Sequence, residues 1–147
     1  MNDCTVLVVG GAGYIGTHMV NELLKAKISV ISLDNLSTGH RDLHPGGLLI
    51  EGRLGDAALL DDIFSSHAID AVMHFAAYSL VGESVADPLK YYRNNLAETT
   101  ELLDAMRRHD VRRFIFSSSA AVYGEPVAVP ISEDHPCDRF AIYGGAG

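Results

Sequence analysis

The stretch Gly10-Gly11-Ala12-Gly13-Tyr14-Ile15-Gly16 decides the fold, because it joins the apolar run from Thr5 to Val9 to residues 18–25. This pattern predicts a strand, a tight glycine turn and a helix. Glycine accepts positive φ and has no Cβ, so a pyrophosphate can approach the backbone and lie at the helix N-terminus. A second apolar run, from Ile28 to Leu33, ends on Asp34, about eighteen residues beyond the last glycine, where a ribose-binding carboxylate is expected.

Asp34 also indicates which dinucleotide would bind. A carboxylate accepts hydrogen bonds from the 2′- and 3′-hydroxyls of NAD, but it repels the 2′-phosphate of NADP. No Arg or Lys adjoins Asp34 in the sequence, so NAD is predicted. The alternative is a ligand-free turn with Asp34 capping a loop, and the strand context and the spacing of the acid disfavour it.

Composition predicts a single domain and narrows the classes of partner. The chain has 147 residues, 48% of them hydrophobic, and a net charge of −8. An acidic chain of this kind disfavours nucleic acid and membrane surfaces as partners, since both attract concentrated basic patches. The one dense basic cluster, Arg107-Arg108 with Arg112-Arg113, is interpreted as a solvated helix end.

Cysteine and histidine positions predict neither a disulfide framework nor a metal site. Cys4 and Cys137 stand alone, and His40 and His44 lie in a loop rich in turn-forming residues, where a spacing of four does not place them on one face. We find no basic leader segment and no apolar run of about 18 residues, so a cytoplasmic location is expected.

Five apolar runs alternate with helical segments, which predicts an α/β fold with a doubly wound parallel sheet. The expected strands are 5–9, 28–33, 48–51, 70–75 and 113–117. Asp56 is expected to cap one helix, and Asp87 with Pro88 to begin a longer one. Helical spacing predicts that the inner side of the longer helix carries Leu89, Tyr92, Leu96, Leu103 and Met106.

Ligands bind at the carboxyl ends of such strands, so four segments should meet at one edge of the sheet. These are Gly10–Gly16, Asp34, Phe75–Ala77 and Ser117–Ser119. Tyr143 follows the serines by about 24 residues, and a serine with a tyrosine beside a nicotinamide suggests carbonyl/alcohol redox chemistry. Alternatively, the serines satisfy turn backbone and Tyr143 is a packing aromatic.

Longer motifs resemble the extended short-chain dehydrogenase/reductase family, and within it the UDP-glucose 4-epimerases. They are Gly10–Gly16, Leu33–His40, His74–Ala77, Val81–Val85, Pro88–Tyr92 and Phe116–Gly124. The resemblance spans the whole chain and implies a Rossmann-type NAD-binding domain. Gly82-Glu83-Ser84-Val85 and Tyr91-Tyr92-x-Asn94-Asn95 are more specific to the epimerases than the glycines are.

The resemblance also implies roles for individual residues. Pyrophosphate contacts are implied for Gly10, Gly13, Tyr14, Ile15 and Gly16. Contacts with the adenosine ribose are implied for Asp34, Asn35, Leu36, Ser37, Thr38 and Gly39. The rest of the cofactor site is implied to include Phe75, Ala76, Ala77, Asn94 and Ser117. Ser119 and Tyr143 match the catalytic serine and tyrosine.

In that family a tyrosinate removes the proton of the sugar 4-hydroxyl and hydride passes from C4 to NAD. The 4-keto sugar then rotates, and hydride returns to its other face. A UDP-hexose is thus the implied substrate. The competing activity is 4,6-dehydration, which needs an acid/base pair near C5 and C6. This chain has Ala120-Ala121 where that pair is expected, so dehydration is disfavoured.

Several positions depart from the family pattern. Gly147 occupies the place of the catalytic lysine, Arg53 that of an aspartate which accepts from adenine, and Ser79 that of another lysine. Arg53 cannot accept a hydrogen bond, so NAD affinity is expected to fall unless the nearby Asp56 substitutes.

The resemblance covers only the N-terminal half of such an enzyme, so we expect a truncated chain, an incomplete NAD-binding domain over residues 1–147 without a substrate domain. A non-catalytic NAD-binding fragment is therefore the alternative function. An unpartnered apolar helix face and a bare edge strand predict poor solubility or self-association. The family suggests a homodimer through residues 91–106.

Overall fold

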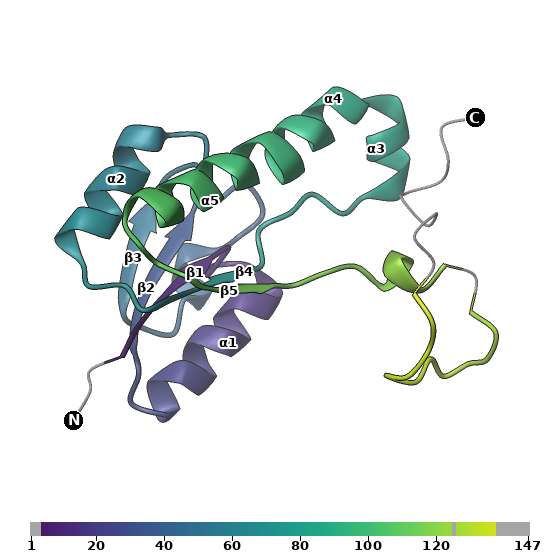
Figure 1. Ribbon diagram of the computed structural model, residues 1–147, viewed down its shortest axis with the longest axis horizontal. Helices are drawn as coiled ribbons and strands as arrows, with labels where there is room; N and C mark the ends of the chain where they lie inside the picture. The colour runs from purple at the N-terminus through teal and green to yellow at the C-terminus, as the bar shows by residue number, and fades with distance from the viewer. Residues whose placement is uncertain (1–3, 125, 138–147) are drawn as a thin grey trace. The chain divides into compact units, whose positions relative to one another are not determined.

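A parallel sheet of five strands, in the order β3-β2-β1-β4-β5, organises the first part of the chain (Figure 1). The computed structural model describes residues 4–124 and 126–137, and the chain separates into two compact units, Met1–Phe116 and Ser117–Gly147. The strands are β1 (Thr5–Val9), β2 (Ser29–Asp34), β3 (Leu48–Glu51), β4 (Ala71–His74) and β5 (Arg113–Phe116). The predicted fold class and its five strands are thus confirmed, with ends that differ by one residue or less.

The helices connect consecutive strands and cover both faces of the sheet. They are α1 (Tyr14–Lys25), α2 (Ala57–Ser66), α3 (Val81–Ala86), α4 (Pro88–Tyr91) and α5 (Glu98–Arg108). A short 3₁₀ turn, η1 (Arg41–Leu43), precedes β3, and a π-helical segment, η2 (Tyr92–Ala97), joins α4 to α5. In Figure 1, α1 lies on one face of the sheet, and α2 and α5 lie on the other.

Alternation along the strands divides the core into two layers. Leu7 and Val9 of β1 pack with Leu60 and Leu102 in one cluster, on the face covered by α2 and α5. Val6 and Val8 point the other way, into the cluster that contains Val20 and Leu23 of α1. Strands buried on both faces require apolar residues at successive positions, as the β1 sequence has.

Two helix starts match the sequence prediction. The Asp56 carboxylate accepts a hydrogen bond from Leu59 N–H at 3.0 Å, and Asp87 accepts one from Lys90 N–H at 3.2 Å, ahead of Pro88 at the first helical position. Each side chain satisfies a backbone donor that has no partner within its own helix.

The predicted inner side of the long helix is wrong except at Met106. Leu102, Ala105 and Met106 are buried, whereas Leu89, Tyr92, Leu96 and Leu103 are 43–62% exposed. A segment with π-type hydrogen bonds has more residues per turn than the 3.6 of an α-helix. The apolar stripe counted from Pro88 therefore loses its phase across η2 before it reaches the sheet.

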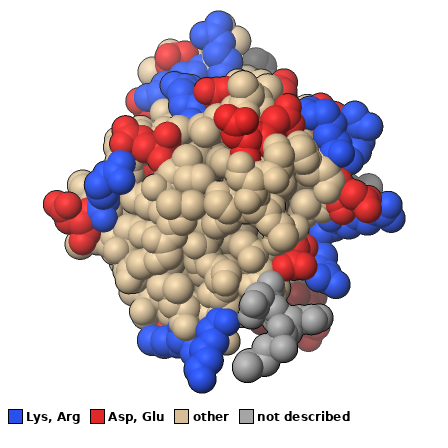
Figure 2. All heavy atoms as spheres, turned by 90° about the vertical axis from the view of Figure 1, so that its left-hand side faces the viewer, with Lys and Arg blue, Asp and Glu red and all other residues tan. Residues whose placement is uncertain are grey.

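Charged groups pair with one another around the surface. Arg108 bonds to Asp61 at 2.9 Å and also to Asp104, Arg107 bonds to Asp104 at 2.9 Å, and Arg112 bonds to Asp110 at 2.8 Å. On the face drawn in Figure 2, basic and acidic side chains alternate around a broad uncharged area. The basic cluster is thus largely neutralised, as expected for a solvated helix end.

The second unit, Ser117–Gly147, begins with exposed serines and contains the 3₁₀ helix η3 (Ala120–Tyr123). Within its described part, Val122 N–H donates to Ser119 O at 3.1 Å, and the rings of Tyr123 and His135 meet edge to face at 5.7 Å.

Candidate dinucleotide site

The glycine turn after β1 leaves no room for side chains. Gly10 has φ +79°, and a Cβ added there would lie 2.7 Å from Ala76 N. A Cβ on Gly16 would overlap the Gly10 carbonyl oxygen and lie 2.8 Å from the Gly10 carbonyl carbon. At Gly13, by contrast, the nearest atom to an added Cβ is 3.4 Å away, so this glycine opens the turn rather than packing it. These glycines bring α1 close to the sheet and expose the turn backbone.

The N-terminus of α1 is available to an anion. Gly13 is its N-cap and has no side chain to bond the first-turn N–H groups, and the first turn contains no acidic residue. Those N–H groups belong to Tyr14, Ile15 and Gly16, because Thr17 N–H already donates to Gly13 O at 2.9 Å. Unpaired N–H groups and the helix dipole together favour a phosphate at this point.

Asp34 faces the glycine turn at the end of β2. Its Oδ2 accepts from Ala12 N–H at 2.9 Å, and its Oδ1 accepts from Leu36 N–H at 2.8 Å. Val9 pairs with Leu33 in the sheet, which brings the two strand ends together. Each carboxylate oxygen has a second lone-pair direction, so both remain able to accept from a hydroxyl group. The residue as a whole is buried, at 9% exposure.

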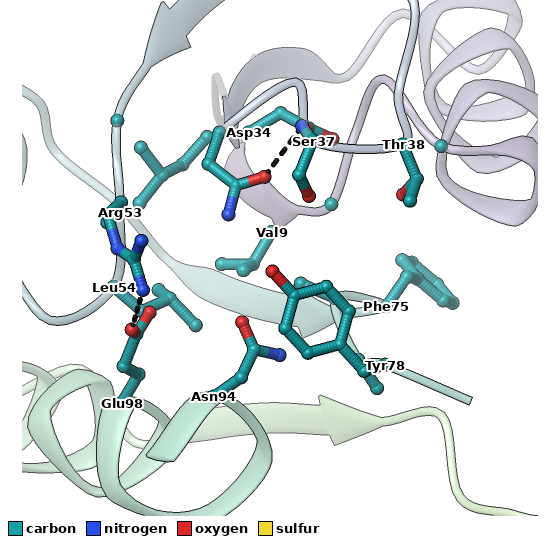
Figure 3. A pocket seen from close by; sticks show the side chains of 17 residues that line it. Val9, Asp34, Ser37, Thr38, Arg53, Leu54, Phe75, Tyr78, Asn94 and Glu98 are labelled. Carbon is teal, nitrogen blue, oxygen red and sulfur yellow. Dashed lines mark hydrogen bonds and ion pairs between the residues drawn. The ribbon is translucent and has the colours of Figure 1, made fainter. Parts of the chain in front are cut away.

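These elements line one pocket within the unit Met1–Phe116, at the carboxyl edge of the sheet (Figure 3). The pocket runs along the ends of β3, β2, β1 and β4, and it includes the point between β1 and β4 where the strand order reverses, which is the ligand position of open α/β sheets. Ten residues predicted from the sequence line it: Gly10, Gly13, Asp34, Asn35, Ser37, Thr38, Phe75, Ala76, Ala77 and Asn94.

Other predicted residues lie beside the pocket lining. Tyr14 and Ile15 begin α1 and are 82% and 56% exposed, while Gly16 is buried beneath the turn. Leu36 has φ +54° and holds the loop against Asp34. Gly39 is buried close to the Ala12 backbone.

The predicted redox residues and the predicted cofactor contact Ser117 belong to a different unit from the one that contains this pocket. Ser117 and Ser119 belong to the second unit, whose placement relative to the sheet is not defined. Tyr143 and the predicted lysine position, Gly147, lie outside the described residues. Their roles remain predictions from the resemblance.

Seven further residues line the pocket: Val9, Leu33, Gly52, Arg53, Leu54, Tyr78 and Glu98. Arg53 stands where the family pattern has an adenine-contacting aspartate, and the other six were not predicted as part of the site. Arg53 Nη2 and Glu98 Oε1 form an ion pair of 2.5 Å across the pocket end, and Figure 3 shows the Tyr78 ring directed into the pocket. Strand-end position could have indicated Leu33 and Gly52. Glu98 comes from α5, far along the chain, and has no local signal.

A buried polar network supports the wall formed after β4. Ala76 N–H donates to His74 Nδ1 at 3.3 Å, so Nε2 carries the proton that bonds Thr99 Oγ1 at 2.9 Å. Thr99 in turn donates to Asn95 O at 2.9 Å. The Asn95 side chain holds both the N–H and the carbonyl of Tyr78, each at 2.9 Å. The loop after β4 is therefore fixed to the π-helical segment.

Burial lowers the pKa of His74 to about 4. A neutral imidazole suits this network, because one ring nitrogen accepts and the other donates. His74 therefore orders the wall of the site and does not exchange protons near neutral pH.

The described residues contain neither a metal-binding cluster nor a membrane-spanning helix. Across residues 4–124 and 126–137, no three His, Cys, Asp or Glu side chains come together as a metal site would require. Over the same residues, no helix combines the length and the apolar character needed to cross a bilayer.

Comparison with known families agrees with this geometry. The sequence profile of the NAD dependent epimerase/dehydratase family matches residues 6–146. The chain belongs to this family. The match includes β1, the glycine turn and Asp34, which are the elements that build the pocket.

Similar proteins within the family are UDP-glucose 4-epimerases. The enzyme from Halalkalibacterium halodurans is 53% identical over 139 residues, covering 95% of this chain and 42% of the relative. The enzyme from Azospirillum brasilense is 49% identical over 142 residues, covering 96% and 41%. The predicted resemblance to UDP-glucose 4-epimerases is confirmed.

Solved structures agree with the fold of this family member. A crystal structure of UDP-glucose 4-epimerase from Brucella ovis in complex with NAD has a TM-score of 0.85 at 47% identity, covering 92% of this chain and 42% of that one. The enzyme from Bifidobacterium longum, in complex with NAD⁺ and UDP, has a TM-score of 0.84 at 43% identity, with 92% and 43% covered. The chain thus spans about two fifths of the relatives it matches.

Proposed function

We propose that this family member binds NAD and acts in the inversion of C4 of a UDP-hexose, as the cofactor-holding part of a UDP-glucose 4-epimerase. The observation that carries the proposal is the hydrogen bond of 2.9 Å from Ala12 N–H to Asp34 Oδ2. This bond holds the carboxylate that we assign to the ribose directly beside the turn that we assign to the diphosphate. The NAD and UDP complexes of the Brucella ovis and Bifidobacterium longum relatives support the same assignment.

The pocket residues fit the parts of NAD. We assign the diphosphate to the first-turn N–H groups of α1, where Gly10 and Gly13 leave the backbone open. Asp34 would accept from the hydroxyls of the adenosine ribose. Phe75 to Ala77 and Asn94 would form the wall toward the nicotinamide. The bound nicotinamide supplies a reversible hydride acceptor.

The charge distribution of the pocket favours NAD over NADP. Asp34 is a buried carboxylate beside the proposed ribose position, where it would repel a 2′-phosphate. Arg53 is the one Lys or Arg among the described residues that line the pocket, and its guanidinium is paired with Glu98. Pairing leaves this cation less able to offset the repulsion by Asp34.

The acid/base step would fall to the second unit of the chain. We propose that Tyr143 removes the proton of the sugar 4-hydroxyl and that Ser119 shares a hydrogen bond to the same oxygen. Both assignments come from the family resemblance.

One coupled experiment tests both parts of the proposal. The purified chain is incubated with NAD and UDP-galactose, and bound NAD and UDP-glucose formation are scored together. We expect saturable NAD binding that Asp34→Asn weakens. NAD binding without turnover would restrict the function to cofactor binding, and a chain that does not bind NAD would refute the proposal.

We also propose that the chain forms a homodimer through the exposed apolar side of α4, η2 and α5. Leu89, Tyr92 and Leu96 are 60–62% exposed along this side. Sedimentation velocity should give a dimer for the wild type and a monomer for Leu89→Lys/Leu96→Lys. An unchanged sedimentation coefficient in the double variant would exclude this interface.

A further inference from the structure

The end of the pocket beyond Asp34 is closed by an ion pair that joins two separate parts of the chain. Arg53 follows β3 and Glu98 begins α5, and Arg53 Nη2 lies 2.5 Å from Glu98 Oε1 (Figure 3). The Glu98 side chain is 14% exposed and that of Arg53 is 62% exposed. The hydrogen bond to Glu98 raises the pKa of Arg53. Arg53 thus covers Glu98 from the solvent side.

The Glu98 carboxylate is held in place, but only one of its two oxygens accepts a hydrogen bond from the protein. Gly55 makes room for it, since a Cβ at that position would lie 3.3 Å from Glu98 Cγ and 3.5 Å from Oε1. Oε1 accepts from Arg53, whereas Oε2 has no hydrogen-bond partner among residues 4–124 and 126–137. The Glu98 side chain is mostly buried at the pocket wall, so its unpaired oxygen is well placed to accept a hydrogen bond from a donor on a ligand.

The order of the strands places the adenine ring at this end. With the diphosphate at α1 and the ribose at Asp34 on β2, the base must continue outward toward β3, the neighbour of β2. Leu33 and Leu54 provide apolar surfaces there, and Arg53 and Glu98 provide the polar edge. Adenine has one exocyclic amino group, which is a donor only.

We propose that Glu98 Oε2 accepts a hydrogen bond from the amino group of this adenine, with Arg53 holding the carboxylate in position. The inference rests on the proposed NAD site and assigns the residue that selects the base. Arg53 itself offers donors only. Asp56, the other acid nearby, caps α2 through Leu59 N–H at 3.0 Å and does not line the pocket.

The test compares NAD with its deamino analogue, nicotinamide hypoxanthine dinucleotide, by calorimetric titration of the full chain. Hypoxanthine presents a carbonyl oxygen where adenine has the amino group, and this oxygen would face the carboxylate. Leaving two acceptors opposed costs about tenfold or more in affinity. We expect the wild type to prefer NAD by at least that factor.

Glu98→Gln should reduce this preference to about threefold or less, because an amide can turn to accept from adenine or to donate to hypoxanthine. Glu101→Gln, on an exposed position of the same helix, should leave the preference unchanged. Arg53→Gln should lower NAD affinity and retain a preference for adenine.

The outcomes separate this inference from the proposed function. If wild-type NAD binding depends on Asp34 but the wild type binds both dinucleotides equally, the assignment of Glu98 is wrong and the NAD site stands. An unaltered preference in a folded Glu98→Gln variant has the same meaning. If the wild type binds neither dinucleotide, the site and the assignment are both overturned.

Discussion

Replacing Gly16 by alanine should destabilise the chain, although alanine is the better helix former. Gly16 and Gly82 both lie in helices, α1 and α3, and helix propensity alone favours alanine at each by about 1 kcal/mol. At Gly82 an added Cβ meets nothing within 4 Å, so the full gain is available. At Gly16 the same Cβ overlaps the Gly10 carbonyl oxygen and lies 2.9 Å from Gly11 Cα.

The contacts at Gly16 are with backbone atoms, which cannot rotate away. Forcing α1 back from the turn should cost about 3 kcal/mol, the upper part of the range for overpacked sites. The gain of about 1 kcal/mol in helix propensity offsets part of this cost, so Gly16→Ala should lower the free energy of unfolding by about 2 kcal/mol. It should also weaken NAD binding, because the first-turn N–H groups of α1 move with the helix.

Urea unfolding followed by circular dichroism measures both variants against the wild type. Gly82→Ala should unfold at the same or a higher urea concentration, with an unchanged slope. If Gly16→Ala proves as stable as the wild type, or if Gly82→Ala loses as much, the close approach of α1 to the glycine turn is not what requires glycine.

Three further outcomes are expected. The pKa of His74 in the folded chain, about 4, lies below its unfolded value of 6.5, so the unfolded state binds the proton first as the pH falls. The free energy of unfolding should therefore fall by about 2 kcal/mol between pH 7.5 and pH 5, and urea unfolding of His74→Gln should not show this fall. An equal fall in the variant would contradict the assignment to His74. Leu102→Ala should lower the free energy of unfolding by about 2–5 kcal/mol because Leu102 is fully buried, whereas Leu103→Ala, at a residue that is 43% exposed, should lower it by under about 1 kcal/mol. If thermal unfolding gave the reverse order, the helix face predicted from the sequence would be the correct one. Asp34→Asn should weaken NAD binding about tenfold or more and reduce the preference for NAD over NADP, whereas the control Asp42→Asn, at an exposed position, should change neither. An unchanged NAD affinity of Asp34→Asn in a calorimetric titration would show that Asp34 does not contact the cofactor.

The sheet could be predicted from local sequence, because each strand has its own apolar run and each turn its own signal. The glycine turn, Asp34 and the cap at Asp56 needed only a few neighbouring residues to be interpreted. The prediction of the buried helix face was wrong because it depended on more than local sequence. Whether Leu102 or Leu103 faces the sheet depends on the geometry of η2, and its π-helical turns have no simple signature in the sequence.

The candidate site divides in the same way. Gly10, Asp34 and Phe75 stand at or directly after strand ends, so the rule that ligands bind at strand ends was sufficient to find them. Glu98 enters the pocket from the start of α5, and Tyr78 is held there by Asn95. Such contacts join residues far apart in the chain, and they appear only when the tertiary structure is known.

The register of β1 bears on the order in which the dinucleotide pocket assembles. Val6 of β1 pairs with Val30 on one side and with Ala71 on the other. The approach of Asp34 to the glycine turn needs only the first of these pairings, which closes a short loop, whereas the wall formed by Phe75 to Ala77 needs the second, which closes a much longer one. Since longer loops cost more chain entropy, we expect the glycine turn and Asp34 to come together earlier in folding than the wall that begins at Phe75.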